Sequence, residues 1–179
     1  MIKVYVKGFA GNLGTKVLIE NKYDELSKHF SEEYLKVLLK SLNETLEDGD
    51  NPSLSMLDRI IDVEKVSKGG VLSALWKICE RNKWGLEYSL REIPILQGTV
   101  EIANYFDINP YRLLSENVFI LASDKDYESE EIYNIFEIGE IRNTKKRVRI
   151  DCESEAFLTK DYKDEIDSII PKYTKKYES

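Results

Sequence analysis

The chain has 179 residues, and its 26 lysine and arginine residues against 33 aspartate and glutamate residues give a formal net charge of −7. Hydrophobic residues make up 42% and aromatic residues 11%, which suits one globular domain with a buried core and argues against low-complexity disorder. The acidic balance also argues against a general nucleic-acid binder, because neutralising phosphates needs a basic face.

Apolar spacing and turn residues predict the following elements in chain order. The first half contains a strand at 2–7, a glycine turn at 8–15, a strand or short helix at 16–20, helices at 22–29 and 31–46, a short helix at 53–61 and a connector or strand at 62–68. The second half contains a helix at 69–83, a strand at 84–90, an extended segment at 93–96, a helix at 98–106, a turn of helix at 110–114, strands at 118–122 and 132–141, a hairpin partner at 145–151 and a charged helical tail at 160–177.

The order of these elements predicts the fold class. Strands and helices mix without strict βαβ alternation, so we expect an α+β fold with a mixed or antiparallel sheet and helices packed on it. We expect this domain to span residues 1–155, followed by a charged, helical C-terminal tail at 156–179. Ser31 is the predicted N-cap of the helix at 31–46 because a serine there can accept a hydrogen bond from the first turn.

Cysteine and histidine usage predicts a cytoplasmic chain without a metal site. Cys79 and Cys152 lie far apart and are expected to be reduced thiols, although one bridge between them stays open. His29 is the single histidine, so neither a zinc site nor a histidine-dependent catalytic unit is expected, and no catalytic residue is assigned. The strand pattern at 2–7 does not resemble a signal peptide, and the apolar run at 118–122 is too short to span a membrane.

The glycine turn at 8–15 is the first candidate ligand site. Gly11 and Gly14 allow close approach to the backbone, Asn12 and Thr15 add polar side chains, and free N–H groups in such a turn can hold a phosphate or carboxylate. The spacing matches neither a Walker A loop nor a dinucleotide fingerprint. An ordinary turn between two elements is therefore the favoured interpretation, and an anion site is the alternative.

A second candidate precedes the clearest helix of the chain. Gly69 and Gly70 stand at its start, where unpaired N–H groups and the helix dipole favour an anion, and Lys65 and Lys68 add positive charge. Ser67 could instead cap a tight helix entry, and the two interpretations are equally supported.

Two further segments carry weaker signals. Ser115 and Asn117 stand before the strand at 118–122, where such residues often close a turn. The basic residues at 145–149 follow equally dense acidic residues, so a solvated hairpin is favoured over a nucleic-acid patch.

Taken together, these segments resemble the C-terminal half of the aminoimidazole ribonucleotide (AIR) synthase-related family. That family includes AIR synthase of purine biosynthesis, formylglycinamidine synthetase, thiamin-monophosphate kinase, selenide water dikinase and the carbamoyl dehydratase of hydrogenase maturation, and the order and spacing look most like the last of these. The resemblance spans roughly residues 4–150 and is carried by five segments in order: Ala10–Thr15, Gly69–Trp76, Ile93–Ile95, Asn109–Ser115 and Ile138–Ile141.

The resemblance implies an ATP-utilising class of enzyme that activates an oxygen by phosphorylation. In that family the N-terminal half supplies most nucleotide-binding and metal-binding acids, and the C-terminal half closes over the ligand with its glycine turns. ATP and Mg²⁺ are therefore implied for the complete enzyme, whereas no cofactor is expected on this chain alone. The site residues implied here are Gly11, Asn12, Gly14, Thr15, Lys65, Ser67, Lys68, Gly69, Gly70, Ser115 and Asn117.

The sequence departs from the family pattern at several points. It begins where the C-terminal half begins, Lys65 stands where the family commonly has an acidic residue, and Ser115-Glu116-Asn117 replaces a Ser-Gly pair. An ammonium cannot replace a carboxylate that serves a metal. The C-terminal cysteine of the hydrogenase-maturation enzyme is also absent, since the chain ends at Ser179.

Two functions follow as alternatives. The first is a ligand-binding half that takes a phosphate-bearing or small anionic ligand and is completed by a separate N-terminal ATP-binding half or by a homo-oligomer. The second is a stand-alone, non-catalytic binding or interaction protein derived from the same family. In either case we expect no catalysis by the chain alone, no nucleic acid and no membrane. A third possibility is an unrelated α+β domain, which a structure would establish if the turn at 11–15 did not lie next to the helix start at 69–70.

Overall fold

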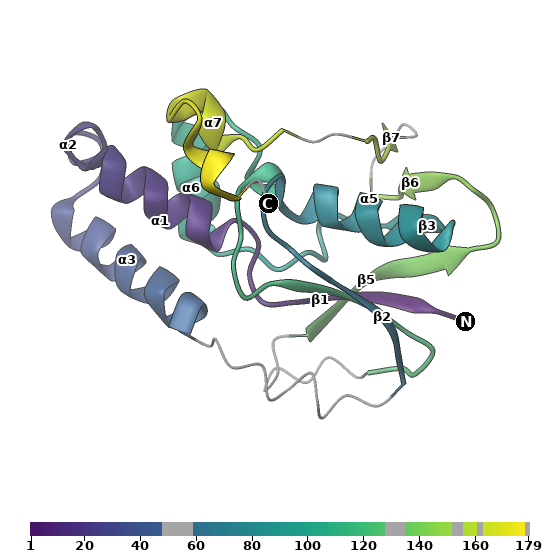
Figure 1. Ribbon diagram of the computed structural model, residues 1–179. Coiled ribbons are helices and arrows are strands. Elements are labelled where there is room, and N and C mark those ends of the chain that lie inside the picture. Colours follow the sequence, from purple (N-terminus) through teal and green to yellow (C-terminus); the bar gives the residue numbers. More distant parts are fainter. Residues whose placement is uncertain (48–58, 128–134, 152–155, 161–162, 178–179) are drawn as a thin grey trace.

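A computed structural model describes residues 1–47, 59–127, 135–151, 156–160 and 163–177 (Figure 1). Its strands are β1 (Lys3–Lys7), β2 (Ile60–Lys65), β3 (Gly85–Tyr88), β4 (Phe119–Ser123), β5 (Ile135–Arg142), β6 (Arg147–Arg149) and β7 (Ala156–Phe157). Its helices are α1 (Asn12–Asn21), α2 (Tyr23–Leu26), α3 (Glu32–Glu47), α5 (Gly70–Asn82), α6 (Gln97–Tyr105) and α7 (Ile166–Ile169), with the 3₁₀ turns η1 (Pro110–Arg112) and η3 (Tyr173–Tyr177).

The described strands form one mixed sheet in the order β2-β4-β1-β5-β3-β6-β7. The first five of these strands pair antiparallel with their neighbours, and β6 pairs parallel with β3, placing Leu86 opposite Arg147. Because β1 lies inside the sheet, both of its faces are covered: Val4 and Val6 are buried in one core and Tyr5 in the cluster on the opposite face. The α+β fold with a mixed sheet is confirmed.

Helix α5 lies along one face of the sheet and forms the larger core with it. Its apolar residues are spaced three and four apart, so they share one side of the helix. Val71, Leu75 and Ile78 on this side are fully buried against Val6 and Ile120 of the sheet. Burying each such side chain is worth about 1.5–3 kcal/mol, so this contact fixes where the start of α5 lies.

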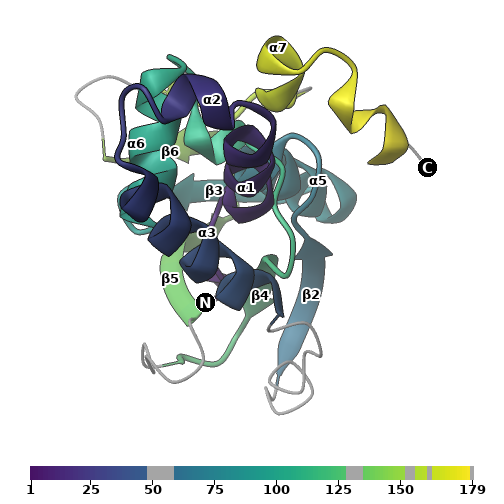
Figure 2. The same cartoon turned by 90° about the vertical axis from the view of Figure 1, so that its left-hand side faces the viewer.

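The remaining helices gather at one end of the sheet, on the same side as α5 (Figure 1). Leu18 of α1, Leu35 and Leu42 of α3 and Ile102 of α6 meet in a second core. Ile166 of α7 is buried in this core. The C-terminal segment lies on the helix side of the sheet in Figure 1 and also in the view of Figure 2, which is turned by 90°. The opposite face of the sheet carries a smaller cluster around Tyr5.

Several local predictions are confirmed. Ser31 accepts a hydrogen bond from the N–H of Tyr34 at 3.2 Å, as an N-cap does, and Asn109 does the same for Tyr111 at 3.0 Å before η1. Cys79 is a free, buried thiol, and burial raises its pKa to about 11, which keeps it protonated and unreactive. Cys152 and most of the predicted helix at 53–61 lie outside the described residues.

Other predictions were wrong or only partly right. The segment 16–20, left open between strand and helix, belongs to α1, which begins directly after Gly11. The segment 145–151 does not form a hairpin with β5, because β6 pairs with β3 and β7 instead. In the described part of the tail, the helical segments are α7 and η3, and β7 adds a short strand before them. The domain boundary at 155 stays a prediction.

No helix in the described part of the chain is long and apolar enough to cross a membrane.

Candidate ligand site at two glycine turns

The first glycine turn connects β1 to α1 and is closed by hydrogen bonds within the chain. Gly11 has a φ of 73°, in the left-handed region that glycine adopts without strain, and it forms the N-cap of α1. The Ser115 hydroxyl oxygen accepts from the N–H of Gly11 at 2.9 Å, and the Thr15 hydroxyl donates to the Gly11 carbonyl at 2.8 Å. Ser115 and Thr15 are buried, so both hydroxyls serve the turn itself.

Asn12 ties this turn to the segment before β4. Its side-chain amide donates to the Glu116 carbonyl at 2.8 Å, and its side-chain oxygen accepts from the Glu116 N–H at 3.0 Å. The Asn117 amide donates to the carbonyl of Leu46, at the end of α3. A hollow of about 350 Å³ opens beside Gly8 and Asn117, between the end of β1 and α3. The structure therefore places Asn12 beside the segment that contains Ser115 and Asn117, while the Asn117 side chain points to the end of α3.

The second glycine turn enters α5 through two left-handed glycines. Gly69 has a φ of 80° and Gly70 a φ of 65°. A Cβ at Gly70 would lie 2.4 Å from the Tyr111 carbonyl oxygen, so the absence of a side chain there allows η1 to pack against the helix start. The Gly70 N–H donates to the Ser67 carbonyl at 3.1 Å. Ser67 thus closes the turn with its backbone.

A carboxylate from the C-terminal segment occupies the start of α5. The two oxygens of Asp164 accept from the N–H of Gly69 at 2.8 Å and from the N–H of Ile166 at 3.1 Å, and the backbone of Leu114 also bonds to this carboxylate. Asp164 is only 2% exposed. Burial raises the pKa of its carboxyl above the usual range, even though the three backbone groups favour the charged form.

Leu114 joins the two turns. Its backbone bonds to Asp164, and its carbonyl accepts from the N–H of Gly14 at 2.7 Å. The turn at Gly11 and the start of α1 therefore lie next to the helix start at 69–70, so the arrangement that would have indicated an unrelated domain is not found.

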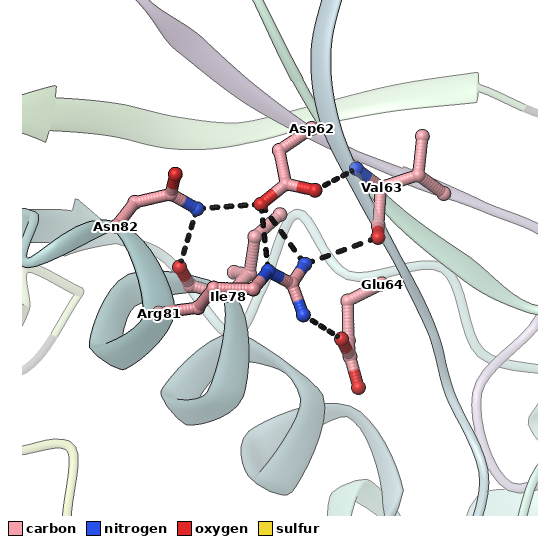
Figure 3. Close-up of polar contacts among 6 residues, drawn as sticks. All are labelled: Asp62, Val63, Glu64, Ile78, Arg81 and Asn82. Atoms are coloured by element: carbon pink, nitrogen blue, oxygen red, sulfur yellow. Dashed lines mark hydrogen bonds and ion pairs between the residues drawn. The ribbon is translucent and has the colours of Figure 1, made fainter.

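Helix α5 is also fixed at its other end, by a polar cluster on the edge strand β2 (Figure 3). The Arg81 guanidinium contacts the carboxylates of Asp62 at 2.9 Å and Glu64 at 2.7 Å, and the Asn82 amide donates to Asp62 at 2.5 Å. Partial burial opposes ionisation of Asp62, but the hydrogen bonds from Asn82 and Arg81 outweigh it and lower its pKa. Because both ends are anchored, the glycine turn at the start of α5 has a defined position.

A pocket of about 630 Å³ opens beside the second turn. Lys68 and Lys163 line it together with Arg112, whose guanidinium pairs with the Glu165 carboxylate at 3.1 Å. Asp164 and other acidic residues of the C-terminal segment line it as well, so cations and anions face each other across it. Lys65 does not line this pocket: it is exposed on β2.

The predicted anion-binding amides already have acceptors within the chain. The N–H groups of Gly11, Gly14, Gly69 and Gly70 donate to Ser115, Leu114, Asp164 and Ser67, respectively. A ligand would have to replace these acceptors, so ligand binding by these residues stays a prediction.

Sequence reasoning missed Asp164. Its bond to Ile166 is a local Asx turn that the sequence could have indicated, but its bond to Gly69 spans 95 positions.

The residues beside the second turn do not fit a Mg²⁺–ATP site. Lys65 stands where the resemblance implies an acidic ligand, and an ammonium cannot coordinate a metal ion. The Asp164 carboxylate is engaged by backbone groups. Among the described residues, His, Cys, Asp and Glu side chains form no group of three that could hold a metal ion. We therefore derive no metal-dependent step.

Comparison with known proteins supports the fold. No family model and no curated protein matches the sequence. A HypE–HypF complex matches with a TM-score of 0.64, 16% identity and coverage of 89% of this chain and 53% of that chain. The hydrogenase maturation protein HypE in complex with ATP matches with a TM-score of 0.62, 14% identity and coverage of 92% and 52%. Thiamine monophosphate kinase from Aquifex aeolicus matches with a TM-score of 0.59, 14% identity and coverage of 83% and 52%.

These solved structures have AIR synthase-like folds, and the match falls on their C-terminal half. The chain thus shares the fold of that half and spans about half the length of the structures it matches.

Proposed function

We propose that this chain is the ligand-binding half of an AIR synthase-like, ATP-utilising assembly, takes a phosphate-bearing or small anionic ligand, and is completed by a second domain or polypeptide. The observation that carries the proposal is the second glycine turn, where the Asp164 carboxyl oxygens accept hydrogen bonds from backbone groups at the start of α5. A phosphate oxygen is an acceptor of the same kind and suits a helix start for the same reason.

Two comparisons support the proposal. The HypE that matches this chain was solved with ATP, and another was solved bound to HypF, so proteins with this fold bind a nucleotide and a protein partner. Lys68 and Lys163 at the pocket would attract a phosphate once the Asp164 carboxylate moved away.

Thermal denaturation with inorganic phosphate, ADP and ATP tests ligand binding, because a ligand that binds only the folded state raises the melting temperature. We expect phosphate-bearing ligands to raise it for the wild type and for Lys77→Ala, an exposed lysine on the outside of α5. The Lys68→Ala/Lys163→Ala variant should lose the shift. No shift with any of the three ligands would refute the proposed ligand class.

An ATPase assay tests completion by a partner. We expect no activity from the chain alone and measurable activity after mixing with the separately produced N-terminal half of a protein encoded near it. If the mixture stays inactive with every such partner, the second function stands: a non-catalytic binding or interaction protein. The engagement of the turn amides within the chain supports that alternative.

A further inference from the structure

The basic segment at 145–147 faces a pocket instead of solvent alone. Since β6 pairs parallel with β3 and antiparallel with β7, the preceding turn is brought beside the C-terminal end of α5. The resulting pocket has a volume of about 580 Å³, within the range of small-molecule sites. Its lining comes from three places in the chain: Trp76, Glu80 and Lys83; Lys145, Lys146 and Arg147; Phe157 and Leu158.

Arg147 is held in place within this pocket by three contacts. Its guanidinium carbon lies 4.2 Å from the centre of the Trp76 ring, its Nε donates to the Trp84 carbonyl at 3.1 Å, and its Nη2 lies 2.9 Å from the Glu80 carboxylate. The Arg147 side chain is only 10% exposed. These contacts fix one wall of the pocket, and they pair Glu80, the acidic side chain that the described residues contribute to its lining.

Among the described lining residues, three lysines then remain without an acidic partner. Lys83, Lys145 and Lys146 are exposed, and the ion pairs among the described residues include none of them. Their concentration around one pocket contrasts with the chain's net charge of −7. Exposed like charges at one opening attract an anion, and the attraction weakens with added salt.

The rest of the lining is apolar and aromatic. Phe157 is 51% exposed at this pocket, so its ring is available to a ligand that enters it. Trp76 is half-buried, with its ring between the core and the pocket. A flat ring could pack on these side chains while its acidic group reaches the lysines.

The geometry points to a second ligand site here, for a small planar anion: an aromatic ring that carries a phosphate or carboxylate group. It is separate from the glycine-turn site, because α5 has 13 residues and its two ends are therefore about 20 Å apart. The inference does not rest on the proposed function of the glycine turns.

Tryptophan fluorescence tests the inference directly. Trp76 and Trp84 are the two tryptophans of the chain, so Trp84→Phe leaves Trp76 as a single reporter in the pocket and keeps the Trp84 carbonyl that Arg147 needs. We expect AMP, which combines a ring and a phosphate, to change this fluorescence with a Kd at least about tenfold lower than adenosine or inorganic phosphate.

Two variants in this reporter background assign the contacts. Lys145→Ala/Lys146→Ala should weaken AMP binding about tenfold, whereas the matched control Lys36→Ala/Lys77→Ala on exposed helix faces should not. Phe157→Ala should weaken AMP but not phosphate. Circular dichroism melting checks that each variant is folded.

The inference is overturned if AMP binds no better than adenosine and phosphate, or if the Lys145→Ala/Lys146→Ala variant binds AMP like the control. Tighter binding of a glutamate-rich peptide than of AMP would assign the pocket to a protein partner and would also overturn it.

Discussion

Replacing Asp164 with alanine removes the carboxylate that joins the C-terminal segment to the start of α5. The backbone N–H groups of Gly69 and Ile166, together with Leu114, then lose their buried acceptor. Each buried N–H left unpaired costs about 1–3 kcal/mol, while the removal of a desolvated charge returns part of this. We expect a net loss of about 2–4 kcal/mol in the free energy of unfolding, or about 4–16 °C in melting temperature for a domain of this size.

Urea denaturation followed by circular dichroism measures this loss. Asp24→Ala is a suitable control, because Asp24 is exposed on α2 and should change stability by less than about 0.5 kcal/mol. If Asp164→Ala matched this control, the carboxylate would contribute nothing to the turn. The argument that the turn binds an oxygen acceptor, and hence could take a phosphate oxygen, would then fail.

Three further outcomes follow from the same geometry. Gly70→Ala should lower the free energy of unfolding by more than about 3 kcal/mol, because the new Cβ would lie 2.4 Å from the η1 backbone and the residue has a left-handed conformation. The Cβ of Gly14→Ala would lie 3.1–3.3 Å from its neighbours, so this variant should change stability by no more than about 1 kcal/mol. Urea titrations compare the two variants. Since burial raises the pKa of Asp164, ionisation of this carboxyl disfavours the folded state. The stability of the wild type relative to Asp164→Asn should therefore be greatest at acidic pH and should fall as pH rises through the raised pKa. The sign reverses at Asp62, because its pKa is lowered. The stability advantage of the wild type over Asp62→Asn should be present at neutral pH, at about 0.5–1 kcal/mol for this partly exposed cluster, and should vanish as pH falls through the lowered pKa. A stability difference that stays the same across pH in denaturation curves would contradict this.

Local chemistry in the sequence was enough to predict most elements. Ser31 and Asn109 bond to N–H groups two or three positions away, and such short-range caps are visible in the sequence. The apolar spacing of α5 likewise indicated the face that packs on the sheet.

The parts that were not predicted depend on contacts distant in the chain. The parallel pairing of β6 with β3 joins residues about 60 positions apart. The residue pattern of a basic segment after a turn does not indicate whether the segment pairs with β5 or with β3. The acceptors of the turn amides are equally distant: glycines indicated where the backbone could receive an anion, but the sequence did not show that Ser115 and Asp164 would fill those places.

The distance between Gly69 and Asp164 has a consequence for how the chain is made. Synthesis proceeds from the N-terminus, so the start of α5 leaves the ribosome long before residue 164 is made. In the same way, Gly11 in the first turn is made 104 positions before Ser115, its hydrogen-bond acceptor. Both turns can be completed only late, after slow closure of long loops. In a chain that stops before residue 164, the Gly69 N–H at the start of α5 would therefore lack its acceptor. Such a chain should be more readily degraded than one that stops just after α7.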